Sequence, residues 1–275
     1  MKKFLFIEIP THRNFGLDLL RFIAIMMVMI NHSQLQIPHV LRKPFQFLIF
    51  DGVLVFFVLS GFLIGSIIIN QFENTENNFS SLINFWFKRW FRTLPAYLFV
   101  LSIIIFLSTV SISNFDIHKT FSYYFFIQSF LYHDGYFFPE AWSLAIEEWF
   151  YLLFPLLLLV VGFAKRVPFK TRILIVILFF ILGSIFLREY FFLFRQKLIF
   201  SQREWDMNFR SVTIFRLDSI GFGILIAFIK KYYISVYQFL NKFIFAFIGF
   251  AILIFLRFYQ LLNDDCNNSW FMCVL

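Results

Sequence analysis

The 275-residue sequence has few cysteines and few charges, and it contains no long polar stretch. Its two cysteines, Cys266 and Cys273, both fall within the last ten residues, so they form neither a metal cluster nor a disulfide framework. No internal repeat is visible, and no pair of Gly- or Pro-broken helices occupies matching positions. These absences argue against a transporter built from inverted repeats.

Apolar residues dominate the chain instead. Hydrophobic residues make up 60% of it and charged residues only 15%, and the mean hydropathy is +0.78. This composition predicts an all-α, polytopic membrane protein whose partner is the lipid bilayer. We interpret the net charge of +8 as Lys and Arg of cytoplasmic loops, and not as nucleic-acid binding. The N-terminus, Met1–Pro10, is basic and briefly apolar but has no small-residue cleavage site, so we do not expect a signal peptide.

Apolar runs of about bilayer length predict seven crossings, at 15–35, 45–69, 94–113, 142–164, 173–190, 211–229 and 243–262. The basic segment 85–95 predicts an amphipathic interfacial helix. The apolar patch at 121–131 is short, and we expect a re-entrant or interfacial helix there. If it crossed, the basic loops at 165–172 and 230–231 would lie outside the cell, against the positive-inside rule. This topology places the N-terminus in the cytoplasm and the protein in the inner membrane.

The first predicted span carries three ionisable residues, Asp18, Arg21 and His32. A charged side chain in hydrocarbon costs about 2.5–3.5 kcal/mol on insertion scales, so a mere anchor has no reason to hold them. Arg21 and His32 are eleven residues apart, which returns to nearly the same helix face about 16 Å further along the axis. Asp18 lies one turn before Arg21 and can pair with it.

The predicted topology separates the remaining ionisable groups by depth. On the inner side lie Arg21, Arg89 and Arg92. In the outer half lie His32, Asp51, Glu147, Glu148, Arg216 and Asp218. Ionisable residues inside a membrane are functional candidates by default. A purely structural role stays open for three of them. Asp51 could be a charge at the membrane edge, and Arg216 and Asp218 could pair with another helix.

His32 is predicted to be a general base or a proton relay, the alternative being a hydrogen-bonded core histidine. A neutral imidazole needs an acceptor to orient it, and Glu147, Glu148 or Asp51 could supply one. Glu147 and Glu148 lie about 100° apart on their helix and cannot both face one point. We therefore favour Glu147 as the inward-facing member.

Arg89 and Arg92 are three residues apart and share a helix face. With Lys88 beside them, they predict a phosphate clamp on the cytoplasmic side, because guanidinium forks match phosphate oxygens. The alternative is an interfacial anchor. Four glycines, Gly61, Gly65, Gly221 and Gly223, are expected to permit close helix packing.

Five segments in order resemble the acyltransferase-3 family of membrane-bound acyltransferases. They are Leu17-Asp-Leu-Leu-Arg21 with His32, Gly52-Val-Leu-Val-Phe-Phe-Val-Leu-Ser-Gly-Phe-Leu-Ile64, Phe87-Lys-Arg-Trp-Phe-Arg-Thr-Leu-Pro-Ala-Tyr97, Ala141-Trp-Ser-Leu-Ala-Ile-Glu-Glu-Trp-Phe-Tyr-Leu-Leu-Phe-Pro155 and Phe215-Arg-Leu-Asp-Ser-Ile-Gly-Phe-Gly-Ile-Leu-Ile-Ala227. Lys88 stands where an arginine is common, which keeps the charge but loses the bidentate fork. Together these segments cover most of the chain.

The resemblance implies a single integral-membrane acyltransferase domain over residues 1–275. Such enzymes move an acyl group, often acetyl, from cytoplasmic acyl-CoA to a hydroxyl of an envelope glycan or other acceptor. It implies no permanently bound cofactor and no metal. By the same resemblance, His32 is the essential histidine with Arg21 as its partner, Arg89 and Arg92 meet the coenzyme A phosphates, and Glu147 is the glutamate of the W-S-L motif.

Three alternatives remain open at this stage. The acyl group could pass directly to the acceptor or through a transient acyl-histidine. Members of the family are usually longer, so the chain could be truncated at its C-terminus and inactive. A multi-pass transporter or flippase of an envelope precursor is the competing class.

Overall fold

The structure is a computed structural model that describes residues 14–33, 51–74, 79–112, 115–132, 137–163, 166–195, 206–242 and a few positions between 244 and 255. Within these ranges every regular element is helical and no strand occurs. The predicted all-α fold is therefore confirmed for this part of the chain.

Among the described residues, five helices are long and apolar enough to cross a membrane. They are α1 (Phe15–His32), α3 (Gly52–Asn74), α4 (Phe79–Ser111), α6 (Ala141–Gly162) and α7 (Phe169–Arg195). In place of the span predicted at 211–229, α9 (Leu217–Tyr232) has 16 residues, about 24 Å at 1.5 Å per residue. The span predicted at 243–262 lies almost entirely outside the described residues. The structure supports a polytopic bundle with five such helices and does not confirm the count of seven.

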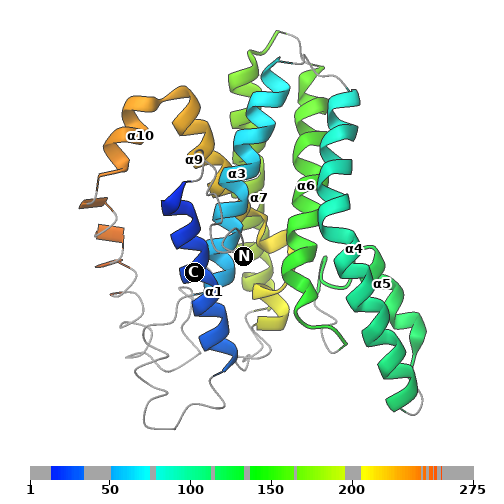
Figure 1. The fold of residues 1–275 in the computed structure, drawn as a ribbon. Helices are drawn as coiled ribbons and strands as arrows, with labels where there is room; N and C mark the ends of the chain where they lie inside the picture. The colour runs from blue at the N-terminus through cyan, green and yellow to red at the C-terminus, as the bar shows by residue number, and fades with distance from the viewer. Residues whose placement is uncertain are drawn as a thin grey trace, which may run out of the picture.

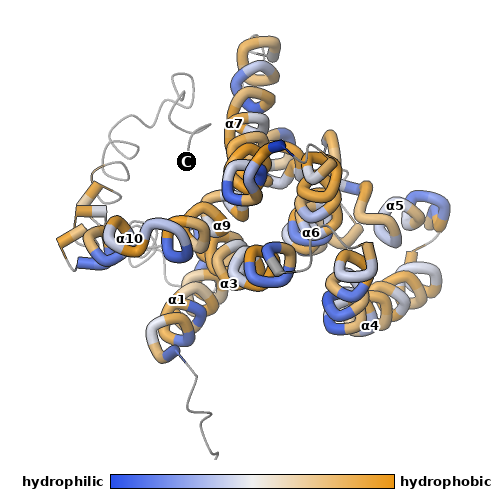
Figure 2. Tube along the Cα trace, turned by 90° about the horizontal axis from the view of Figure 1, so that it is seen from above, coloured by the Kyte–Doolittle hydropathy of each residue, from blue (hydrophilic) through white to orange (hydrophobic). Residues whose placement is uncertain are grey.

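Helix α3 lies between α1 and α6 in the bundle. Seen from above, α1 lies on one side of α3, and α6 and α4 lie on the other (Figure 2). Helix α9 packs along α3 and α7. It is followed by α10 (Ile234–Leu240), a short helix that the sequence did not predict. Figure 1 shows α1 descending beside the rising α3, so these two helices are antiparallel.

Helix α1 begins at Asn14, whose side chain accepts a hydrogen bond from the backbone N–H of Gly16 (3.1 Å). Such a cap satisfies one of the free N–H groups of the first turn. The helix packs on α3 where Gly52 meets it, and a Cβ at Gly52 would lie 2.5 Å from the carbonyl oxygen of Ala24. Ala24 is the one buried residue of α1, so this contact fixes the relative height of the two helices.

Helix α4 corrects one prediction. The expected interfacial helix at 85–95 and the expected span at 94–113 form a single helix of 33 residues that continues through Pro95. Side chains seven and four residues apart, and so on one face of the helix, bond to α6 and to residue Tyr123 on both sides of this proline: Trp86 and Thr93 before it, and Tyr97 after it. This continuous packing stabilises a helix that Pro95 alone would tend to break.

The segment around 121–131 forms no helix long enough to cross a membrane. It consists of the 3-10 turn η2 (Ile117–Thr120), the single helical turn α5 (Phe121–Tyr124) and further turns. Backbone carbonyls hold it in place: Tyr123 accepts from Tyr97 Oη (2.9 Å), Phe126 from Trp149 Nε1 (2.9 Å), and Ser129 from the N–H of Thr213 (2.7 Å). The segment therefore contains no membrane-length helix, in agreement with the expectation that it does not cross, and its re-entrant or interfacial position stays a prediction.

Glycine permits the close approach of α3 and α9. A Cβ at Gly61 would overlap the backbone of Ile220, and one at Gly223 would overlap the carbonyl oxygen of Val58. Gly65 and Gly221 also lie against neighbouring helices, so the packing role expected for the four glycines is confirmed.

Replacing Gly61 with alanine should therefore separate α3 from α9. We expect the melting temperature in detergent to fall by several degrees, because overpacking costs about 1–3 kcal/mol. Gly183→Ala in α7 is the matched control, since a Cβ there meets nothing within 4 Å. It should leave the melting temperature unchanged or raise it. Equal effects of the two substitutions would contradict the packing interpretation.

Candidate functional site

Two of the three ionisable residues of α1 pair as predicted. Arg21 Nη1 donates to Asp18 Oδ1 at 3.1 Å, as the spacing predicted. His32 Nδ1 lies 2.8 Å from the carbonyl oxygen of Val28. A carbonyl oxygen can only accept, so Nδ1 carries a proton in this contact, and in the neutral tautomer of the ring the lone pair then lies on Nε2. The orienting acceptor of His32 is thus the backbone of its own helix, and the ring is exposed.

A second polar group lies between α3, α4 and α6. The carboxylate of Glu147 accepts two hydrogen bonds, one from Ser60 Oγ of α3 (2.9 Å) and one from Tyr151 Oη one turn along α6 (3.1 Å). The guanidinium of Arg89 on α4 stacks over the Tyr151 ring, with Cζ 4.3 Å from its centroid. Cation–π stacking of this kind favours arginine over lysine. We call Ser60, Arg89, Glu147 and Tyr151 the Arg89 group.

Glu148 turns to a different neighbour. Its Oε1 accepts a hydrogen bond from Thr93 Oγ1 of α4 (2.8 Å), and the side chain is buried, with Oε2 lacking a hydrogen-bond partner. Consecutive residues on a helix point about 100° apart. Glu147 and Glu148 accordingly face α3 and α4, as their spacing predicted.

The three cations of the basic segment have different surroundings. Arg89 is half-buried, whereas Lys88 and Arg92 are exposed. The charges of both Arg89 and Arg92 act on the Glu147 carboxylate, which places the two guanidinium groups on one side of α4. Lys88 lies about 100° away from Arg89 around the helix. It therefore does not share the face that meets α6.

The structure does not bring Glu147 to His32. His32 is eight residues beyond Ala24 on α1, and Ser60 is eight residues beyond Gly52 on the antiparallel α3. Because Gly52 and Ala24 touch, His32 and the Glu147 carboxylate are about 24 Å apart along the helix axes, at 1.5 Å per residue. Helix α3 also separates them (Figure 2).

The predicted sorting by depth therefore needs correction. Glu147 and Glu148 were placed in the outer half with His32, but Glu148 accepts a hydrogen bond from Thr93 of the basic segment, and the charge of Arg89 acts on both carboxylates. The error arose because the basic segment was expected at the membrane interface. As part of the continuous helix α4, it instead packs inside the bundle against α6.

The other outer-side candidates belong to an ion network that joins helices. Asp51 caps α3 by accepting from the N–H of Val53 (3.0 Å), and it pairs with Arg210 Nε (2.9 Å). Asp218 pairs with Arg188 Nη2 of α7 (3.1 Å), and both side chains are buried. The alternative of pairing with another helix thus describes Asp218.

Arg216 belongs to the same region. It is buried at the start of α9, and it interacts electrostatically with Arg188, Asp218, Asp51 and Arg210. The network ties α3, α7 and α9 together where α3 and α9 begin.

Sequence reasoning missed several residues of these groups. Arg188 carried the same signal as Arg21, a charge within an apolar run, and the criterion used for α1 would have found it. Ser60, Thr93 and Tyr151 gave no such signal, because hydroxyl-bearing residues are common in membrane helices. Their partners on other helices become visible only in the folded chain.

A family model described as an acyltransferase domain, that of the acyltransferase-3 family, matches residues 14–275. The chain is 38% identical over 125 residues to the peptidoglycan O-acetyltransferase OatA of Listeria monocytogenes, a match that covers 40% of this chain and 20% of that protein. It is 33% identical over 179 residues to the O-acetyltransferase OatA of Staphylococcus aureus, covering 60% and 27%. The chain thus spans about a quarter or less of the length of these relatives. No solved structure matches it.

Proposed function

Because the chain belongs to the acyltransferase-3 family, we propose that it transfers an acyl group from acyl-CoA to a hydroxyl of a cell-envelope glycan. The names of its relatives, O-acetyltransferases of which one is assigned to peptidoglycan, favour acetyl as the group and a glycan as the acceptor. The observation that supports the proposal is the hydrogen bond from His32 Nδ1 to Val28, which selects the tautomer whose neutral ring has its lone pair on Nε2. An unprotonated ring nitrogen is what a general base requires.

In the proposed reaction, Nε2 of His32 takes the proton of the acceptor hydroxyl as its oxygen attacks the thioester carbonyl. The carbon–sulfur bond then breaks, and the imidazolium returns the proton to the departing thiolate. The products are the O-acyl ester and free coenzyme A thiol. Arg21, paired with Asp18 on the same stripe, stabilises negative charge on the approaching donor.

We assign the Arg89 group to the donor end. Arg89 and Arg92 bind the coenzyme A phosphates from the cytoplasm, since guanidinium groups pair with phosphate oxygens in a bidentate way. Glu147 holds Tyr151, and the Tyr151 ring in turn holds the Arg89 guanidinium. Glu147 is then a positioning residue of the donor clamp, and it does not orient His32. The pantetheine arm of the donor then extends around α3, from the Arg89 group to His32.

Purified protein in lipid nanodiscs, given acetyl-CoA and a β-1,4-linked N-acetylglucosamine tetrasaccharide, tests this function. We expect free thiol and tetrasaccharide ester in equal amounts, the first measured with a thiol reagent and the second by mass spectrometry. A flippase would move a labelled envelope precursor between leaflets of a liposome without forming an ester. Thiol release that does not depend on an added acceptor hydroxyl would contradict the proposal.

A further inference from the structure

Two consecutive residues of α6 approach Arg89 from different sides. Glu147 reaches the guanidinium through the Tyr151 ring. Glu148 reaches the main chain of Arg89 through Thr93, one turn further along α4. The Thr93 hydroxyl lies 2.8 Å from Glu148 Oε1 and 3.2 Å from the carbonyl oxygen of Arg89. The Glu148–Thr93 pair thus connects α6 to the peptide group that carries the Arg89 side chain.

Packing alone does not account for a glutamate at position 148. Only 4% of the surface of Glu148 is exposed, and its Oε2 has no hydrogen-bond partner in the part of the chain that the structure describes. Trp90 approaches the same carboxyl without reaching hydrogen-bond geometry. A buried polar atom without a partner destabilises a fold, so a leucine of similar size would suit the surrounding core better. Ionisable residues that are kept inside a membrane bundle at such a cost are functional candidates.

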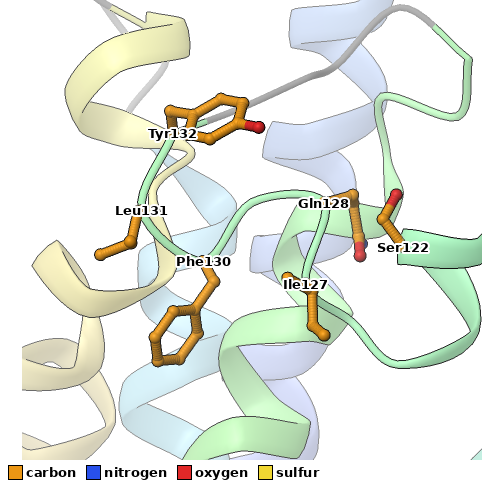
Figure 3. A pocket seen from close by; sticks show the side chains of 6 residues that line it. All are labelled: Ser122, Ile127, Gln128, Phe130, Leu131 and Tyr132. Atoms are coloured by element: carbon orange, nitrogen blue, oxygen red, sulfur yellow. The ribbon is translucent and has the colours of Figure 1, made fainter. Parts of the chain in front are cut away.

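Pro95 makes the direction of α4 depend on side-chain contacts. Proline has no N–H, so the carbonyl four residues earlier lacks its helical donor, and the helix is weakest there. Two residues before Pro95, Thr93 bonds to Glu148. Two residues after it, Tyr97 Oη donates to the carbonyl oxygen of Tyr123 (2.9 Å), in the segment around 121–131 whose side chains Figure 3 shows. The contact at Thr93 therefore helps to set the direction of the half of α4 that carries the basic residues.

We propose that Glu148, acting through Thr93, is a positioning residue of the donor clamp, an inference that rests on the proposed function. It fixes this turn of α4 against α6, so that Arg89 and Arg92 meet the coenzyme A phosphates together. Pairing between guanidinium and phosphate depends on direction as well as on charge, so a rotation of the turn about Pro95 weakens donor binding. A clamp that is fixed before the donor arrives also loses less entropy on binding.

Binding of acetyl-CoA to the full chain in nanodiscs, measured by calorimetry, tests this role. Thr93→Val keeps the shape of the side chain and removes the hydroxyl, and we expect the Kd to rise about tenfold, the equivalent of one hydrogen bond. Thr93→Ser keeps the hydroxyl and should bind nearly as the wild type does. Thr109→Val is the matched control on α4, because Thr109 is exposed and its Oγ1 donates to the carbonyl oxygen of Phe106 on its own helix. It should leave the Kd unchanged.

Variants of Glu148 separate position from charge and from stability. Glu148→Gln keeps an acceptor for Thr93 without the charge, so its Kd should stay near that of the wild type. Thr93→Val combined with Glu148→Leu replaces both partners with apolar groups, which should restore the melting temperature lost in Thr93→Val. We expect the Kd of this double variant to stay raised, whereas a purely structural role predicts that both quantities recover.

The outcomes separate this role from the catalytic function. A raised Kd for acetyl-CoA in Thr93→Val and in the double variant, with a normal Kd in Thr93→Ser, supports the role even if no ester forms in any variant. A normal Kd and KM in Thr93→Val overturn the role and leave the acyltransferase function standing. Recovery of the Kd in the double variant also overturns it. So does a Kd in Glu148→Gln that rises as much as in the double variant, because the charge and not the hydrogen bond would then be responsible.

Discussion

Replacing His32 with alanine should abolish acyl transfer and leave a folded protein in the membrane. The side chain is exposed, and its one described bond is to its own helix, at Val28, so the fold does not depend on it. Removing a general base lowers the rate by about 10²–10⁴-fold. Ester formation on the tetrasaccharide measures the loss, and circular dichroism and membrane fractionation check the fold.

Two further variants separate the chemistry of His32 from its position. Asparagine at position 32 can still donate to the Val28 carbonyl, but it has no group that replaces Nε2, so His32→Asn should be as inactive as His32→Ala. His118→Ala removes another exposed histidine, from η2, and should keep wild-type activity. A His32→Asn variant with normal activity would show that the ring acts only through its hydrogen bond and would refute the general-base role.

The parts of this protein that the sequence predicted are those that depend on local pattern. Apolar runs placed α1, α6 and α7 within a few residues of where they lie, because hydropathy and helical period are properties of consecutive residues. The pairing of Asp18 with Arg21 was predictable for the same reason, since both lie on one turn. Charge bias between loops predicted that 121–131 does not cross, and the structure has no membrane-length helix there.

What the sequence did not predict are pairings between helices. The chain contains several carboxylates and several hydroxyls near the right depth, and composition does not say which of them meet. Glu147 was one of three carboxylates expected to orient His32, because all of them were assigned to the outer half. The structure instead pairs Glu147 with Ser60, 87 residues earlier. The continuity of α4 through Pro95 was hidden as well, because the packing that maintains it involves α6.

The second large effect is expected from Arg89, which we assign with Arg92 to a clamp on the coenzyme A phosphates. Arg89→Ala should raise the KM for acetyl-CoA about 10–100-fold, since hydrogen bonds to a charged group contribute about 1.5–3 kcal/mol and each 1.4 kcal/mol is tenfold. We expect kcat to change much less, because the phosphates are bound equally in the ground state and the transition state. Arg89→Lys keeps the charge but loses the bidentate guanidinium fork and the stacking on Tyr151. Its KM for acetyl-CoA should therefore fall between those of the wild type and Arg89→Ala. Steady-state release of coenzyme A thiol measures both constants.

Lys88→Ala is the matched control for Arg89, because Lys88 is the neighbouring cation and points away from α6. If the clamp depends on geometry, this variant should keep a nearly normal KM. If the segment attracts coenzyme A only through its total positive charge, Lys88→Ala and Arg89→Ala will raise the KM equally. The second result would contradict the assignment of Arg89 to the clamp.

Tyr151→Phe then tests the role of Glu147, because it removes the hydroxyl that joins the carboxylate to the ring beneath Arg89. It should raise the KM for acetyl-CoA with little effect on kcat, as a positioning role predicts.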